Sequence, residues 1–193
     1  MSLRHSVLGL LQYAPLNGYA IKKIFDLSIN NIWTAKLSQI YRELALLEKQ
    51  GLVSSRTVRQ GSRPNKKVYA LTPKGDQAFR EWLNEFPVAF GPPRRDEFLL
   101  RVFFASRMDE KLLKRELEGF VLMIEKHLPL INEAKIPELA ETLARAAGGS
   151  RENKARAGME HDARFWKFTV RRFQLTAEAT LRWARECLTE LEV

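Results

Sequence analysis

The side chains of this sequence that could bind a partner are cations and amides, and they are gathered in its N-terminal half. Five cations lie between Arg56 and Lys67, with no acidic residue among them. The segment before them carries Lys36, Gln39 and Arg42. In the DNA major groove Gln pairs with adenine and Arg with guanine, while Lys and Ser hold phosphates. These types and spacings indicate recognition of a polyanion rather than catalysis.

Signatures of an enzyme or a metal site are missing from the sequence. His5, His127 and His161 lie far apart, and there is no HxxxH or CxxC pair. There is also no GxSxG, P-loop or GxGxxG motif. Cys187 has no His on its predicted helical face, which fits a structural thiol. We therefore expect no catalytic residue, no metal and no cofactor.

A helix followed by a hairpin would position the cations. Residues 37–50 carry apolar residues at the i, i+3, i+4, i+7 spacing of a packed helix face, and Gly51 ends the pattern. This stripe consists of Leu37, Ile40, Tyr41, Leu44 and Leu47. Residues 52–58 and 67–72 read as strands, and residues 60–66 as the turn between them. The helix is expected to enter the DNA groove and the hairpin tip to hold the flanking backbone.

Two further helices, over residues 3–13 and 18–27, complete a helix-turn-helix. Thr72 and Pro73 are a typical N-cap and first residue of another helix. The candidate DNA-binding residues are Lys22, Lys36, Ser38, Gln39, Tyr41, Arg42, Arg63 and Lys66. A solvated helix face is the alternative for the helical residues, and Tyr41 is as well suited to the core as to a phosphate contact.

The rest of the chain reads as helices after a linker at residues 86–93, which hold one Gly and three Pro. Helices are expected at 96–106, after Asp109, and from 153 or 159 to 191, with a helix or an ordered loop at 136–147. The last helix has apolar residues at alternating spacings of three and four, typical of a helix–helix seam. The candidate dimer-interface residues in this stripe are Trp166, Val170, Phe173, Ala177, Leu181 and Leu188. The expected fold is mainly α with a small two-stranded β wing: a winged helix-turn-helix domain, 1–88, and a helical dimerisation domain, 94–193.

Charge is unevenly distributed along the chain. Residues 1–90 hold 13 Lys and Arg against 6 Asp and Glu, a net charge of +7, whereas residues 91–193 reach only +2. A polyanion would therefore meet the N-terminal half, although a basic surplus also serves solubility. No apolar run is long enough to span a membrane, and a single Cys suits a reducing compartment. We expect a cytoplasmic protein with no membrane partner.

The chain resembles the PadR family of bacterial transcriptional regulators. The matching segments are LGLLQYAPLNGYAIKKIF, LSQIYRELALLEKQGLV and GSRPNKKVYALTPKGDQAF, and less closely PPRRDEFLLRVFFA and FWKFTVRRFQLTAEATLRWARECL. The recognition helix in the family usually reads Gly-Thr-Ile-Tyr-Pro, and this chain differs at Gln39 and Arg42. We expect its own base preference to lie at these two positions.

The resemblance implies a homodimeric repressor that binds a palindromic operator in double-stranded DNA, and for some members release by a phenolic or apolar effector. A second apolar side on the last helix, at Phe165, Phe168 and Leu175, independently favours a dimer, because one neighbour would not cover both sides. Two recognition helices would then lie about 34 Å apart on the DNA. Competing interpretations are a winged-helix protein-interaction adaptor and non-specific or RNA binding.

Overall fold

The computed structural model describes residues 2–29, 32–60, 63–85, 96–148 and 151–192. The expected linker at 86–93 lies outside these residues. The chain divides into two compact units, residues 1–88 with 134–163, and residues 89–133 with 164–193. We expected residues 94–193 to form one domain, whereas residues 134–163 group with the winged-helix unit.

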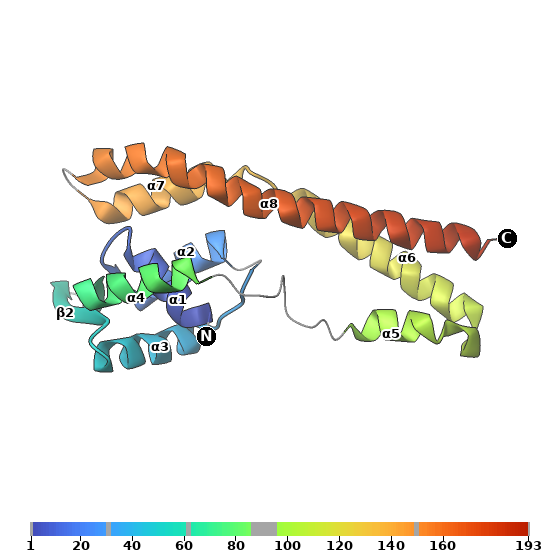
Figure 1. Ribbon diagram of the computed structural model, residues 1–193, viewed down its shortest axis with the longest axis horizontal. Coiled ribbons are helices and arrows are strands. Elements are labelled where there is room, and N and C mark those ends of the chain that lie inside the picture. Colours follow the sequence, from blue (N-terminus) through green and yellow to red (C-terminus); the bar gives the residue numbers. More distant parts are fainter. Residues whose placement is uncertain (1, 30–31, 61–62, 86–95, 149–150, 193) are drawn as a thin grey trace. The chain divides into compact units, whose positions relative to one another are not determined.

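The first unit has the element order of a winged helix-turn-helix (Figure 1). Its elements are α1 (Ser2–Leu11), β1 (Leu16–Asn17), α2 (Gly18–Ser28), α3 (Leu37–Lys49), β2 (Val53–Gln60), β3 (Arg63–Leu71), α4 (Pro73–Asn84) and α7 (Lys135–Ala147), with the start of α8 (Arg151–Glu190). The segment 136–147, for which a helix and a loop were both open, is helical. The fold class of a mainly helical chain with an N-terminal winged helix-turn-helix is confirmed.

The core of the first unit is built by apolar residues at helical spacing on α1, α2, α3 and α7. Its fully buried side chains include Val7, Leu8, Ile21, Phe25, Ile40, Leu44, Leu47 and Leu143. Asn17 caps α2 by accepting the backbone N–H of Ala20, and Thr72 caps α4 by accepting that of Gly75. Gly51 ends the α3 segment with φ of 71°, as its position in the sequence predicted.

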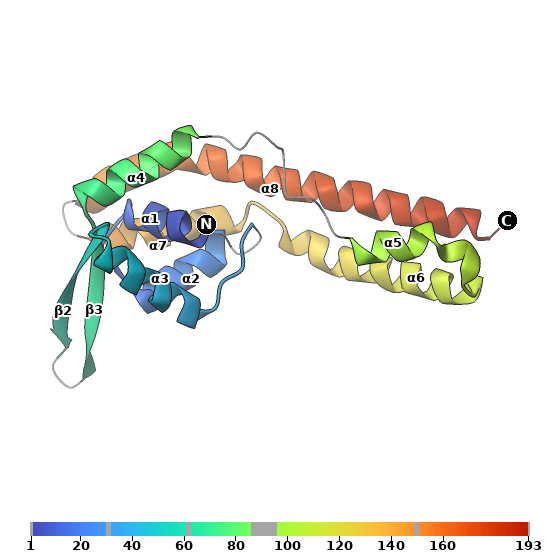
Figure 2. The ribbon, with the colours of Figure 1, turned by 60° about the horizontal axis from the view of Figure 1, so that its bottom comes forward.

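The small sheet is antiparallel with strand order β1-β3-β2, and β2 and β3 form a long hairpin (Figure 2). The expected two-stranded wing is confirmed as β2 with β3. The sheet also has a third strand that was not expected, in which Leu16 and Asn17 pair with Tyr69 and Val68. The expected strand bounds were too short, because β2 extends to Gln60 and β3 begins at Arg63. A two-residue strand carries too little periodicity to be recognised in the sequence.

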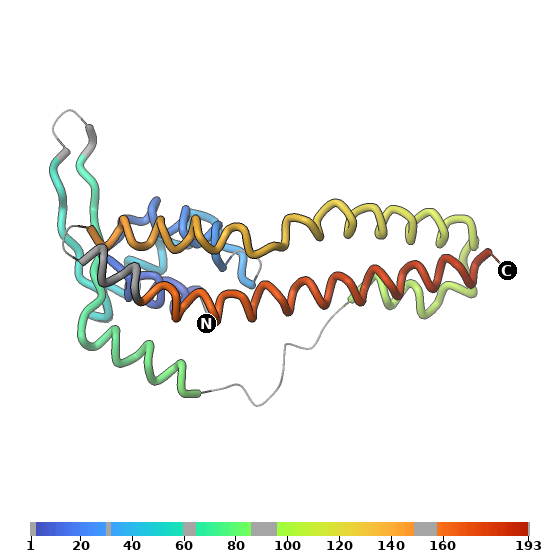
Figure 3. Tube along the Cα trace, turned by 90° about the horizontal axis from the view of Figure 1, so that it is seen from above, coloured from blue at the N-terminus to red at the C-terminus, as the bar shows by residue number. Residues whose placement is uncertain are grey.

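The second unit consists of helices that lie alongside the C-terminal part of α8 (Figures 1 and 3). They are α5 (Glu97–Phe103), η1 (Ala105–Arg107), α6 (Glu110–His127) and η2 (Leu128–Leu130). Asp109 caps α6 by accepting the backbone N–H of Lys111, and the helix ends two residues before Pro129. Phe98, Phe120 and Trp183 form an aromatic cluster between α5, α6 and α8, with centroids 4.8 to 6.5 Å apart.

Candidate nucleic-acid interface

Helix α3 has one buried face and one polar face. Ile40, Leu44 and Leu47 are completely buried, which anchors the helix in the first unit. The polar residues selected from the sequence lie outside this stripe. Lys36, Ser38, Gln39 and Arg42 are all exposed. The helix therefore presents amide, hydroxyl and cationic groups to solvent on a rigidly packed support.

Gln39 has a structural task that the sequence analysis missed. Its side-chain Oε1 accepts the backbone N–H of Lys36 at 2.7 Å. This hydrogen bond satisfies an otherwise unpaired donor at the start of α3, as the Glu or Gln of a capping box does. Bidentate reading of adenine needs both the oxygen and the NH₂ of the amide, so the oxygen that caps α3 would also have to accept from the base through its second lone pair. The sequence does contain the signal for this cap, because Gln39 lies three residues after Lys36, the residue before the helix.

Arg42 is freer to reach a partner. Its side chain is exposed and has no hydrogen bond or ion pair with another described residue. A guanidinium with all its donors available can bind guanine O6 and N7 together. Arg42 is therefore the better placed of the two positions at which this chain departs from the usual recognition helix.

Tyr41 and Lys22 are both partly engaged within the unit. The ring of Tyr41 lies against Gly18 at the start of α2, so closely that a Cβ on Gly18 would be 2.5 Å from its Cε1. The side chain is still 46% exposed, which combines packing with access to solvent. Lys22 forms an ion pair with Asp26 one turn along α2.

The β2–β3 hairpin has two chemically different faces, because alternate residues of a strand point to opposite sides. Arg56 pairs with Val68 and Lys66 with Val58, which places both cations on one face. Neither has an ion-pair partner among the described residues. Lys66 was expected at the tip, but it lies within β3. Arg63 is the first residue of β3, and its side chain is not among those described.

The other face of the hairpin is tied to α3 by Glu48. Lys67 Nζ donates to Glu48 Oε2 at 2.7 Å, and Ser55 Oγ donates to Glu48 Oε1. The hydrogen bonds from Lys67 and Ser55 lower the pKa of Glu48, and the bond to Glu48 raises the pKa of Lys67. This contact could not be predicted from the sequence, because Glu48 and Lys67 are 19 residues apart.

Polar contacts from α1 and from Gln12, the residue after it, hold α3 and α4 in place. Arg4 Nε lies 3.4 Å from Glu43 Oε1 on α3. Gln12 Nε2 donates to Asp76 Oδ1 of α4 at 2.8 Å. The pKa of Asp76 is lowered first by this hydrogen bond and then by Arg80. The polar face of α3 and the hairpin are thus positioned by one framework.

Two family models match nearly the whole chain. The transcriptional regulator PadR-like family matches residues 7–81, and the virulence activator alpha C-term model matches residues 94–192. The chain belongs to the PadR-like family of transcriptional regulators. The resemblance inferred from the sequence is therefore confirmed, and this family is one of regulators, not of enzymes.

Two proteins of known role are similar to this chain. The negative transcriptional regulator PadR of Bacillus subtilis is 39% identical over 105 residues, which cover 54% of this chain and 57% of that protein. The matched part thus spans less than two thirds of the relative. The structure of the Vibrio cholerae virulence activator AphA has a TM-score of 0.66 at 29% identity, over 98% of each chain.

Crystal structures of Bacillus subtilis PadR share the fold. The complex of that protein with operator DNA has a TM-score of 0.72 at 24% identity, over 99% of both chains. Its complex with p-coumaric acid has a TM-score of 0.71 at 23% identity, over the full length of both chains.

In this PadR-like chain the stripe expected at a dimer interface packs largely within the second unit. Leu181 is 9% exposed and Ala184 is completely buried. The other expected interface residues are half-buried in the single chain: Trp166, Val170, Phe173, Ala177 and Leu188.

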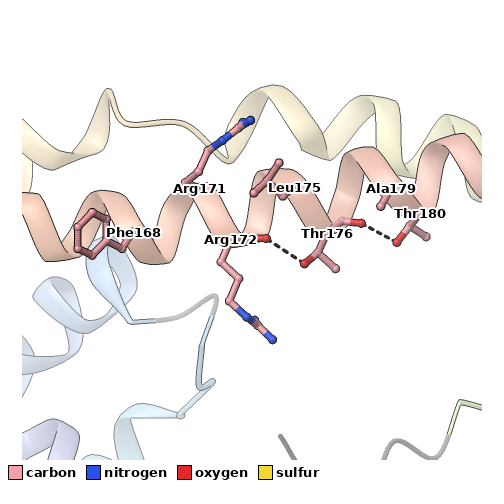
Figure 4. Close-up of a pocket in the computed structure, with 7 residues that line it drawn as sticks. All are labelled: Phe168, Arg171, Arg172, Leu175, Thr176, Ala179 and Thr180. Carbon is pink, nitrogen blue, oxygen red and sulfur yellow. Dashed lines mark hydrogen bonds between the residues drawn. The ribbon is translucent and has the colours of Figure 1, made fainter. Parts of the chain in front are cut away.

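The second apolar side of α8 is open in the single chain. Phe165, Phe168 and Leu175 are each about half exposed, at 50%, 56% and 49%. Phe168 and Leu175 also line a shallow pocket on this side of the helix (Figure 4). The lining residues are Phe168, Arg171, Arg172, Leu175, Thr176, Ala179 and Thr180. Since all of them belong to α8, the single chain supplies only one wall.

The described part of the chain contains no group of three or more His, Cys, Asp or Glu side chains that could hold a metal ion. No helix among these residues has the length and hydropathy needed to cross a bilayer.

Proposed function

We propose that this PadR-like protein is a dimeric, sequence-specific DNA-binding repressor. The observation that carries the proposal is that the exposed polar face of α3 and the hairpin, with Arg56 and Lys66 unpaired among the described residues, belong to one packed unit. Arg42 and Gln39 would read bases, and Lys36 and Ser38 would hold phosphates, with Tyr41 and Lys22 beside them. Arg63 and Lys66 would hold the backbone from the hairpin. This role places the protein in the cytoplasm.

Repression and a phenolic effector are proposed from the relatives. The Bacillus subtilis relative is a negative regulator, and it has been crystallised with operator DNA and with p-coumaric acid. We expect p-coumaric acid, or an apolar molecule of similar size, to release this protein from its operator. Unchanged DNA affinity at saturating p-coumaric acid would exclude that effector.

The DNA-binding role is tested with a duplex selected from a random pool by the wild-type protein. The double variant Arg63→Ala/Lys66→Ala removes two hairpin cations, and Lys111→Ala/Lys126→Ala removes two exposed cations of α6. The hairpin double variant should reduce the magnitude of the negative slope of log K against log salt by about 1.8, roughly 0.9 for each lost phosphate contact. The second should leave it unchanged. Equal behaviour of both variants, or recovery of no preferred duplex, would favour the adaptor or non-specific interpretation.

The dimer is proposed to form through the open side of α8 rather than through the stripe that packs within the chain. A second copy would cover the three half-exposed apolar residues and supply the missing wall of the pocket. Light scattering should give twice the 22.3 kDa chain mass for the wild type. Phe168→Glu/Leu175→Glu should give the single-chain mass. A dimer that survives this change would exclude the assigned face.

A further inference from the structure

Glu48 is the one acidic side chain that contacts the basic hairpin among the described residues. It lies in the last turn of α3, and each oxygen of its carboxylate accepts from a different strand. Ser55 of β2 donates to Oε1, and Lys67 of β3 donates to Oε2 at 2.7 Å. Lys67 also lies 5.2 Å from the ring centroid of Tyr69, which is buried. A single carboxylate thereby ties both strands to the end of α3.

The strand register explains how one residue can hold both strands. Ser55 is paired with Tyr69 and Thr57 with Lys67, so Ser55, Lys67 and Tyr69 share one face of the hairpin. Arg56 and Lys66 lie on the opposite face. The sequence neighbours Lys66 and Lys67 therefore have different surroundings: Lys66 has no described ion-pair partner, and Lys67 is paired with Glu48.

We propose that Glu48 is a positioning residue, which holds the hairpin at a fixed angle to α3 so that both contact DNA together. The proposal rests on the DNA-binding function inferred above. In it, Lys67 acts through Glu48 and not as a phosphate contact. Along the chain, β2 follows α3 through Gly51 and Leu52, and β1 holds β3 by pairing with Val68 and Tyr69. The contacts of Glu48 with Ser55 and Lys67 add a direct connection from α3 to both strands, which opposes a change of the angle between α3 and the hairpin.

The positioning role and simple electrostatics predict opposite effects on DNA affinity when Glu48 is removed. An acidic group beside a basic hairpin repels phosphates, so its loss should strengthen DNA binding. If Glu48 positions the hairpin, Glu48→Ala should instead weaken binding to the selected duplex roughly threefold or more, the scale on which contacting residues couple. Glu81→Gln provides the control, because Glu81 is exposed on α4 and contacts Gln77 of its own helix. It removes the same charge and should not weaken binding.

Lys66 and Lys67 form a matched pair for the salt dependence. Lys66→Met should lower the salt slope by about 0.9, the value for one phosphate contact. Lys67→Met should weaken binding to the same extent as Glu48→Ala but leave the slope unchanged. The double variant Glu48→Ala/Lys67→Met should be no weaker than either single variant, and the exchanged pair Glu48→Lys/Lys67→Glu should recover part of the affinity. A lowered slope for Lys67→Met, or tighter binding by Glu48→Ala, would overturn the proposal.

Hydrogen exchange of the free full-length protein tests the contact without DNA. Amides of residues 53–58 and 65–71 should exchange faster in Glu48→Ala than in the wild type or Glu81→Gln, because an untied hairpin opens more often. Unchanged exchange there would overturn the positioning role. If the wild type selects no duplex but the exchange effect is present, the DNA-binding function fails and the structural contact stands.

Discussion

Gly75, near the start of α4, has no room for a side chain. A Cβ at this position would lie 2.0 Å from the backbone oxygen of Leu52, about 1 Å inside the 3.0 Å limit for real Cβ contacts. That oxygen cannot move freely, because it accepts the backbone N–H of Thr72 at 3.1 Å and the Thr72 hydroxyl at 3.0 Å. In Gly75→Ala the new methyl group would therefore clash with the backbone just before β2, and α4 would have to shift.

Two effects of opposite sign compete in this variant. Alanine in place of glycine favours a helix by about 0.5–1 kcal/mol. Forcing extra volume into a packed site typically costs about 1–3 kcal/mol, and a weakened Thr72 hydrogen bond adds about 1 kcal/mol. The steric cost is the larger because the nearest atom is a tethered backbone oxygen. We expect Gly75→Ala to reduce the free energy of unfolding by about 2 kcal/mol.

Gly119 of α6 gives the matched control, since a Cβ there would meet no atom within 4 Å. Gly119→Ala should stabilise by about 0.5–1 kcal/mol through helix propensity alone. Urea unfolding followed by circular dichroism should shift in opposite directions for the two variants. An equal stabilisation of both would refute the steric reasoning at Gly75.

Three further predictions concern the interface and the first unit. Arg42→Ala should relax base preference at one operator position and cost about 1–3 kcal/mol on the preferred duplex; equal losses on all duplexes would exclude base reading. The contact of Glu48 should stabilise the fold above its usual pKa of 4.5 and be lost as pH falls through its lowered value. The stability difference between wild type and Glu48→Gln should therefore be present at about pH 6 and become smaller as the pH falls below 4.5; a constant difference would argue against the ion pair. Leu143→Ala should lower the free energy of unfolding by about 2–5 kcal/mol, since Leu143 is 1% exposed. An unchanged free energy of unfolding, measured in urea, would contradict the grouping of α7 with the winged-helix unit.

Local signals were enough to predict most of the fold. The buried residues of α3 follow a 3.6-residue period that any amphipathic helix must have to be packed on one side. Thr72 and Asp109 cap helices through hydrogen bonds that span two or three residues. Gly51 ends its helix by its own backbone conformation. In each case the physical cause lies within a few residues of its effect.

The missed features depend on which strands and helices meet. The pairing of β1 with β3 joins Leu16 to Tyr69, and the contact of Glu48 with Lys67 needs both the hairpin register and its angle to α3. A basic run in the sequence does not tell which of its members is neutralised. The structure was needed to show that Lys67 is paired with Glu48 while its neighbour Lys66 is not.

The periodicity of α8 shows why a repeated stripe does not identify its partner. Spacings of three and four residues indicate that one face of a helix is packed against another helix. The same pattern arises whether that helix belongs to the same chain or to a second copy. In this chain the more regular stripe is buried at Leu181 and Ala184 and half-buried at its other residues. The shorter apolar side at Phe165, Phe168 and Leu175 is left half exposed. The apolar side that is more exposed in the single chain is therefore the one with the weaker pattern.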